Sequence, residues 1–161
     1  MLQPGPDHSV DGSRERPPAA AEDLSARIAR RLAGAPIYAT LDVRLIHAAP
    51  GEVVCGMDVT PLHCNVDGIL HGGMSGLLAD TALGFAVRST GSDEATNATL
   101  HAQMTYHRAG RVGDTVRAEA RVVERSGRMV YAECTLTNGR GETLASGTSL
   151  NLLREPDPGS H

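Results

Sequence analysis

Aromatic residues are scarce in this chain of 161 residues: tryptophan is absent, and all aromatic residues together make up 2%. Proteins that bind exposed nucleic-acid bases stack them on aromatic side chains, so such a platform is not expected here. The chain also has no basic run, and its formal net charge is −4 at pH 7. We therefore expect no nucleic-acid partner, and a large anionic ligand must be held by local groups rather than by an overall positive field.

Long hydrophobic runs are missing as well. No stretch reaches the roughly 20 apolar residues that a membrane-spanning helix needs, and the polar, proline-rich start contains no apolar signal-peptide core. The three cysteines, Cys55, Cys64 and Cys134, are odd in number and scattered. This pattern is typical of free thiols in a reducing compartment. We expect a cytoplasmic protein with no membrane partner.

The length fits one domain that can bury a substantial core. Residues 1–20 mix proline, glycine, serine and charges without a period, which predicts a disordered N-terminal tail. Residues 21–153 are expected to form the single domain, and residues 154–161 a flexible C-terminal tail. At the start of the domain, an apolar residue at every fourth position predicts an amphipathic helix over residues 22–33.

The organising element is a helix predicted over residues 74–87. It is apolar on nearly all sides, so it must be buried on most of them. Alternating apolar and polar residues predict six strands, over residues 37–48, 52–59, 95–108, 114–125, 128–138 and 142–153. Short glycine-bearing links predict that the last four strands form an antiparallel meander.

Nothing else in the chain can cover the long helix, so the sheet must curl around it. We therefore predict an α+β fold in which a curved antiparallel sheet wraps one long central helix. The open edges of such a sheet favour a dimer that continues the sheet or pairs the starts of two helices.

One ionisable residue, Asp80, stands inside the predicted helix, and the sequence His-Gly-Gly opens that helix at residues 71–73. A buried carboxylate is costly to keep for structure alone. Asp80 can act as a general base toward water or as a nucleophile. The free amides of Gly72 and Gly73 at the positive helix end can hold an oxyanion, and Asn65 can fix a water or a carbonyl. This set of groups suits acyl transfer to water.

The spacing of these groups creates a difficulty, because Asp80 lies ~10 Å beyond Gly73 along a helix axis. The two either serve different sites, or a two-fold dimer brings Asp80 of one subunit to the helix start of the other. Simpler interpretations stay open for each residue alone. Asp80 can form a structural ion pair, His71 can be a core histidine, and Asn65 and the glycines can be turn residues.

The pattern N-x-x-G-x-x-H-G-G-x(6)-A-D-x-A runs from Asn65 to Ala82. It resembles the hotdog-fold acyl-CoA thioesterases, most of all the PaaI-like branch related to phenylacetate-pathway and 4-hydroxybenzoyl-CoA thioesterases. The resemblance covers about residues 41–153. It implies an enzyme that hydrolyses a thioester to a carboxylic acid and CoA, with no metal and with no cofactor, since CoA is part of the substrate.

The resemblance also implies roles for single residues. Asp80 would be the catalytic carboxylate in the neighbouring subunit's site, and the Gly72 N–H would polarise the thioester carbonyl. His71 and Asn65 would position that carbonyl and the attacking water, which Thr99 would help to hold. Family members are usually dimers paired into tetramers, so we expect a homotetramer whose active sites are shared within each dimer.

The phosphates of CoA need cations, and the forked donors of arginine suit them. Arg128 matches the resemblance, and Arg108, Arg111 and Arg125 lie on nearby links. Any one of these arginines can equally be an ordinary solvated charge. Apolar residues of the long helix would line the acyl pocket, namely Leu77, Leu78 and Leu83. The expected substrate-binding residues are Gly73, Arg128, Ser126, Gly127, Arg108 and Leu77.

Three alternatives stay open. A metal site could use His63, Cys64 and His71, or His101 and His107, although their spacing matches no zinc pattern. A hotdog hydratase or dehydratase would place its histidine and carboxylate at other positions. A non-catalytic acyl-CoA-binding protein would couple the pocket to a DNA-binding segment, and the first 36 residues contain no helix-turn-helix pattern.

Overall fold

The computed structural model describes residues 23–156, so the predicted N-terminal tail and the last five residues lie outside the described part. In this described part, three α-helices and a short 3₁₀ helix accompany six strands. Their bounds are α1 Leu24–Ala33, α2 Pro36–Thr40, β1 Arg44–Ala49, β2 Glu52–Asp58, η1 Pro61–His63, α3 Gly72–Arg88, β3 Thr96–Tyr106, β4 Thr115–Ser126, β5 Met129–Thr137 and β6 Thr143–Arg154.

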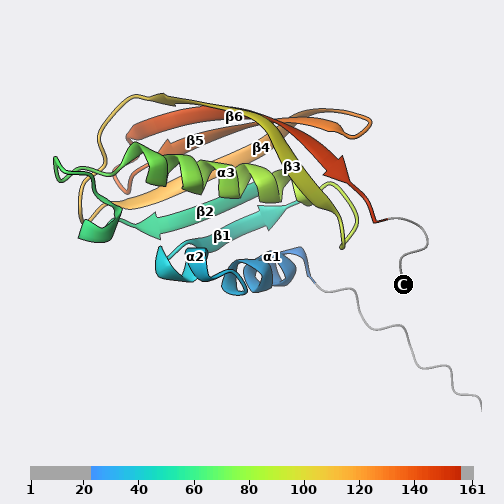
Figure 1. The fold of residues 1–161 in the computed structure, drawn as a ribbon, viewed down its shortest axis with the longest axis horizontal. Coiled ribbons are helices and arrows are strands. Elements are labelled where there is room, and N and C mark those ends of the chain that lie inside the picture. The colour runs from blue at the N-terminus through green and yellow to red at the C-terminus, as the bar shows by residue number, and fades with distance from the viewer. Residues whose placement is uncertain (1–22, 157–161) are drawn as a thin grey trace, which may run out of the picture.

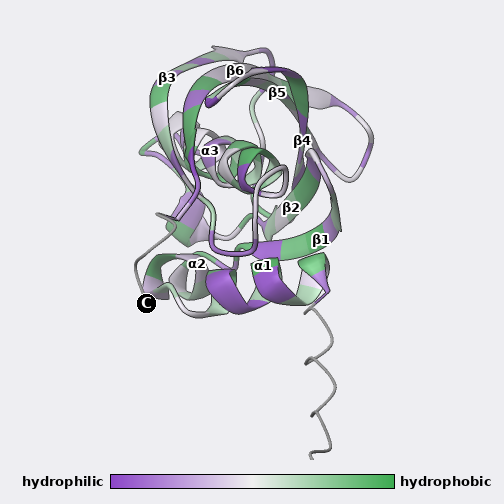
Figure 2. Cartoon of the chain, turned by 90° about the vertical axis from the view of Figure 1, so that its right-hand side faces the viewer, coloured by the Kyte–Doolittle hydropathy of each residue, from purple (hydrophilic) through white to green (hydrophobic). Residues whose placement is uncertain are grey.

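The six strands form one antiparallel sheet in the order β1-β2-β4-β5-β6-β3. The sheet curves around α3, which lies across its concave face (Figure 1). Seen along its axis, α3 occupies the centre of the curve (Figure 2). The predicted α+β fold, a curved sheet wrapped around one long helix, is confirmed.

The core lies between α3 and the sheet. Small residues, among them Ala79, Ala82 and Ala86, are fully buried along α3 and let the strands approach closely. Leu78 and Leu83 fill the remaining space and are at most 2% exposed. Within residues 23–156, no helix combines the length and the apolar character that crossing a membrane requires.

The predicted meander of the last four strands is wrong for β3. This strand pairs with β6, from Thr96 opposite Arg154 to Tyr106 opposite Ala145, while β4 pairs with β2 and β5. The link between β3 and β4 crosses the start of α3, where Gly110 O accepts a hydrogen bond from Leu70 N. A short glycine-bearing link is compatible with a hairpin or with such a crossing. The consequence is that β3 becomes the edge strand that flanks α3.

The strand predicted over residues 37–48 is also wrong in its first part. Residues 36–40 form α2, with Pro36 in the first helical turn, where its fixed φ favours a helix. Asp42 has a φ of 49° and reverses the chain into β1. The alternating pattern that suggested one strand is therefore divided between the short helix α2 and β1. Helix α2 places Tyr38 beside α3.

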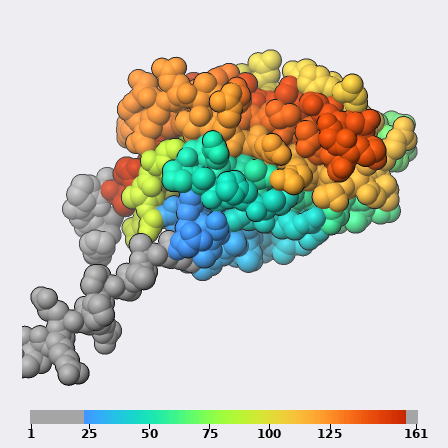
Figure 3. All heavy atoms as spheres, turned by 180° about the vertical axis from the view of Figure 1, so that it is seen from behind, coloured from blue at the N-terminus to red at the C-terminus, as the bar shows by residue number. Residues whose placement is uncertain are grey.

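Helix α1 packs against β1 below the sheet, and it borders the blue-green strands in the view from behind (Figure 3). The Arg27 side chain forms an ion pair with Asp93, and an Arg31 N–H donates to the Asp93 backbone oxygen at 2.8 Å. These contacts fix α1 to the loop between α3 and β3. On the other side of that loop, an Arg125 N–H donates to Thr90 O at 2.8 Å.

Two buried thiols should make the fold less stable at alkaline pH. Burial raises the pKa of Cys55 and of Cys134 to about 12, against roughly 8.5 in an unfolded chain. The stability that comes from keeping these thiols buried and protonated is therefore fully present below the unfolded-state pKa, and it is lost as the pH rises toward 12. Each thiol should lower the free energy of unfolding by up to ~1.4 kcal/mol per pH unit in this window.

Urea unfolding between pH 8 and pH 11 measures this slope, and the absence of lysine from the sequence limits competing titrations. The double variant Cys55→Ala, Cys134→Ala should flatten it. Cys64 is only half-buried, so a thiol reagent at neutral pH should modify this residue alone in the native protein. Rapid modification of all three cysteines would contradict the burial argument.

Candidate active site

The start of α3 presents a backbone donor. His71 caps the helix: its Nδ1 accepts a hydrogen bond from Gly73 N–H at 2.8 Å. Gly72 is the first helical residue, and its N–H has no acceptor within residues 23–156. Tyr106 of β3 donates from its hydroxyl to Gly72 O at 3.1 Å. The cap and the tyrosine hold Gly72 from both sides and leave its N–H available.

Asn65 shapes the loop that leads to this helix start. Its Oδ1 accepts hydrogen bonds from Asp67 N at 3.0 Å and from Ile69 N at 3.3 Å. The side-chain oxygen therefore has the structural role of a turn residue, while Nδ2 has no partner among the described residues. Asn65, Gly72, Tyr106 and Arg108 line a common cavity of about 320 Å³.

Asp80 is exposed in the single chain, which corrects the expectation that its carboxylate is buried. The stripe of α3 that the sheet leaves open consists of Gly73, Gly76, Asp80, Gly84 and Arg88, at intervals of three or four residues. The helix looked apolar all round because three of these five residues are glycines. Asp80 therefore faces the opening beside the edge strand rather than the core.

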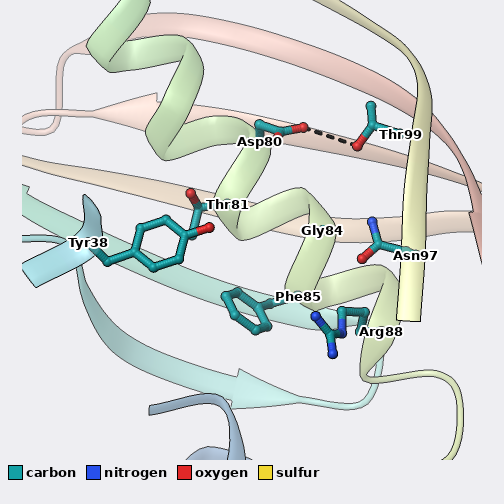
Figure 4. A pocket seen from close by; sticks show the side chains of 8 residues that line it. All are labelled: Tyr38, Asp80, Thr81, Gly84, Phe85, Arg88, Asn97 and Thr99. Atoms are coloured by element: carbon teal, nitrogen blue, oxygen red, sulfur yellow. Dashed lines mark hydrogen bonds between the residues drawn. The ribbon is translucent and has the colours of Figure 1, made fainter. Parts of the chain in front are cut away.

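Thr99 of β3 holds the Asp80 carboxylate, since its hydroxyl lies 3.2 Å from Asp80 Oδ1 (Figure 4). The same hydroxyl lies 3.3 Å from Asn151 Oδ1, so its single proton can serve either oxygen. The register of β3 shifts between Thr99 and His101. Such bulges are common next to active sites, where they re-aim side chains.

A buried amide network behind Thr99 was not anticipated from the sequence. Asn97 donates to Asn151 Oδ1 at 3.1 Å, and Asn151 donates to Ser149 at 2.8 Å. Ser149 and Asn151 are both 1% exposed. The sequence did contain a signal for it, namely two polar residues on the inward face of β6. Buried polar side chains nearly always have hydrogen-bond partners, so these two residues indicate a network.

The catalytic residues expected from the sequence fall into two clusters in one chain. His71, Gly72, Gly73, Asn65 and Arg108 lie around the start of α3. Asp80 and Thr99 lie in a second cavity, of about 200 Å³, between α2, α3 and β3. Eight residues separate Gly72 from Asp80, or ~12 Å along the axis. Leu77 is half-buried against the core, while Leu78 and Leu83 are enclosed in the core and line neither cavity.

The arginines considered for CoA lie at both ends of the sheet. Arg108 donates to Thr143 O at the start of β6, whereas Arg128 O accepts from Leu153 N at its end. Ser126, Gly127 and Arg128 form the exposed turn between β4 and β5. In the described part of the chain, no three histidine, cysteine, aspartate or glutamate side chains are grouped to hold a metal ion.

Comparison with known proteins assigns the family. Residues 67–145 match the family model described as the Thioesterase superfamily. Human acyl-coenzyme A thioesterase 13 is 30% identical over 106 residues, which span 65% of this chain and 75% of that protein. The chain belongs to the thioesterase superfamily. The family and enzyme class predicted from the sequence are confirmed.

Two solved structures are similar to this chain, and the first of them supports the PaaI-like assignment. A mutant of the phenylacetic acid degradation protein PaaI from Thermus thermophilus is 29% identical and has a TM-score of 0.68, covering 73% of this chain and 98% of that chain. The smu.793 protein from Streptococcus mutans UA159, bound to acetyl CoA, is 25% identical and has a TM-score of 0.66, covering 70% of this chain and 88% of that chain.

The His71 cap makes two neighbouring glycines respond differently to alanine. A Cβ on Gly76 would lie 3.8 Å from the Tyr106 hydroxyl, an ordinary contact, so Gly76→Ala should stabilise the fold by ~0.5–1 kcal/mol. A Cβ on Gly73 would lie 2.9 Å from His71 Nδ1 and displace the cap. Gly73→Ala should therefore show no such gain or lose ~0.5–2 kcal/mol. Urea unfolding of both variants tests this, and equal stabilisation would mean that the cap contributes nothing.

Proposed function

We propose that this thioesterase hydrolyses acyl-CoA to a free carboxylic acid and CoA. The observation that carries the proposal is that one helix bears both a Gly72 N–H without an acceptor in the described residues and the Asp80 carboxylate that Thr99 orients, and that each of these groups opens on a cavity. The name of the human relative and the acetyl CoA bound to the Streptococcus mutans protein support CoA as the thiol.

The chemistry follows from these two groups. The Gly72 N–H donates to the thioester oxygen and stabilises the negative charge that develops there, helped by the positive end of α3. In one route Asp80 takes a proton from the attacking water and returns it to the sulfur of CoA as the carbon–sulfur bond breaks. In the other, Asp80 attacks the carbonyl carbon, CoA leaves as its thiolate, and water then hydrolyses the acyl–Asp80 anhydride to the carboxylic acid and the free Asp80 carboxylate. No metal and no cofactor takes part. The His71 cap positions the Gly72 amide, and Asn65 Nδ2 is placed to hold the carbonyl or the water.

A complete site requires two copies of the chain, because Asp80 and Gly72 of one chain line separate cavities. Strand β3 is a sheet edge with an exposed backbone and exposed Leu100 and Tyr106 side chains, each 55% accessible. Antiparallel pairing of β3 with its copy would bring Asp80 and Thr99 of one subunit to the helix start of the other. Such dimers would pair further into the expected tetramer.

The same pairing would assemble the binding site for CoA. It would bring the turn of Ser126, Gly127 and Arg128 toward Arg108 of the partner subunit, because antiparallel pairing of β3 sets opposite ends of the two sheets side by side. The two arginines would then face one CoA molecule, and guanidinium groups pair well with phosphates.

Thiol release from short, medium, long and aromatic acyl-CoA esters tests the proposed reaction. Asp80→Asn should lower kcat by ~10²-fold or more, because the general base is lost. Thr99→Val should lower it less, because the carboxylate stays and only its orientation is loosened. Absence of turnover across the panel would favour a protein that binds acyl-CoA without hydrolysing it, and full activity of Asp80→Asn would place the chemistry elsewhere.

Mixed dimers test whether the sites are shared. Gly72→Pro removes the proposed N–H donor at a position that tolerates proline, and His71, at φ −63° and ψ 132°, already has the extended conformation that precedes proline. Asp80→Asn and Gly72→Pro should each, when tested alone, lower activity by ~10²-fold or more. A random mixture should recover about a quarter of wild-type activity, because half of its dimers contain one intact site. No recovery in verified mixed dimers would show that each site lies within one chain.

A further inference from the structure

The cavity beside Asp80 is charged at both ends. Asp80 and Thr99 lie at one end, and Arg88, from the last turn of α3, lies at the other with Asn97 and Phe85 (Figure 4). Tyr38 of α2 lines the same cavity beside Thr81. Eight residues, or ~12 Å along the helix axis, separate the acid from the base. An acyl group whose first carbon is attacked near Asp80 would extend along α3 toward Arg88.

Arg88 has unused hydrogen-bonding capacity. Its Nε–H donates to Ala95 O at 3.1 Å, and its guanidinium lies over the Phe85 ring, 5.8 Å from the ring centroid. Arginine carries five N–H donors, and the other four have no acceptor within residues 23–156. The side chain is half-buried and fixed by the ring and the carbonyl, so its free donors are held at the cavity rather than spread through solvent.

The carboxylate that shares an adjoining pocket with Arg88, that of Asp93, is already occupied. Asp93 forms an ion pair with Arg27, and its backbone oxygen accepts from Arg31. No carboxylate in the described part of the chain pairs with Arg88. A role as a simple cation at the helix C-terminus explains its charge but not the cavity into which its free donors face.

We infer that Arg88 selects acyl groups whose far end carries a carboxylate, an inference that rests on the proposed hydrolysis at Asp80. Paired charge-assisted hydrogen bonds between a guanidinium and a carboxylate are strong and directional. The Tyr38 hydroxyl has no partner among residues 23–156 and points toward Thr81 of α3 in Figure 4, so it adds a polar group to the cavity wall away from Arg88. Repulsion from Asp80 keeps the substrate's carboxylate at the Arg88 end.

Discrimination arises because a purely aliphatic chain leaves the four remaining N–H donors of Arg88 without an acceptor. Such a chain displaces water from the guanidinium and offers no acceptor in return, which is costly for a charged group. A site built to bind a polar group therefore rejects the analogue that lacks it. The inferred substrate class is medium-chain dicarboxylic acyl-CoA, with one carboxyl group as the thioester and the other free.

Suberoyl-CoA and octanoyl-CoA have the same chain length and differ in the free carboxylate, so the ratio of their kcat/KM values measures the selectivity. In the wild type this ratio should exceed one. Arg88→Met should lower it roughly tenfold or more, the usual effect of losing a hydrogen bond between charged groups, and Arg88→Lys should lower it less. Arg31→Met is the matched control, because it removes a nearby positive charge that does not line the cavity and should keep the wild-type ratio.

The outcomes separate this inference from the proposed function. If neither ester is hydrolysed by the wild type, the thioesterase proposal fails. If octanoyl-CoA is hydrolysed but suberoyl-CoA is not preferred, or if Arg88→Met keeps the wild-type ratio, the role of Arg88 is overturned and the hydrolysis stands. An equal fall in Arg31→Met would assign the preference to the overall field of this region. The wild-type ratio decides even if Arg88→Met is too unstable to purify.

Discussion

The structure depends on the fact that the six-stranded sheet encloses α3 only in part. Helix α3 carries the Gly72 N–H at its start and the Asp80 carboxylate near its middle. Both groups must reach substrate, although most of the helix lies in the core. The sheet solves this by leaving one stripe of α3 open, beside the edge strand β3. Glycines on that stripe keep side chains out of the way, so that the backbone and one carboxylate face the opening.

Local patterns in the sequence predicted most of the fold. The helix, five strands, the second part of the remaining strand and the spaced motif from Asn65 to Asp80 could all be recognised from periodicity or resemblance. The partner of β3 could not, because the register of an edge strand depends on contacts with β6, which is nearly 40 residues away in the sequence. The α2 helix was missed because Pro36 and three alternating apolar residues suit either a strand end or a helix start.

The environment of Asp80 was predicted wrongly for an instructive reason. Hydropathy treats glycine as compatible with a buried face, yet three glycines on the stripe of Asp80 mark the face that is left open. The polar network of Asn97, Ser149 and Asn151 could not be assembled in advance, because it joins β3 and β6 through side chains whose pairing follows the register. Motif spacing identified which residues matter, and only the fold decided which of them meet.

Tyr106 gives the edge strand a second task. It lies at the end of β3 and donates a hydrogen bond to Gly72 O, in the first residue of α3. The strand on which a second copy would dock is thus mechanically linked to the amide that would polarise the substrate. A shift of β3 during association would reach that amide through the single hydrogen bond from Tyr106. Association of the subunits and alignment of the Gly72 amide with the substrate would then occur together.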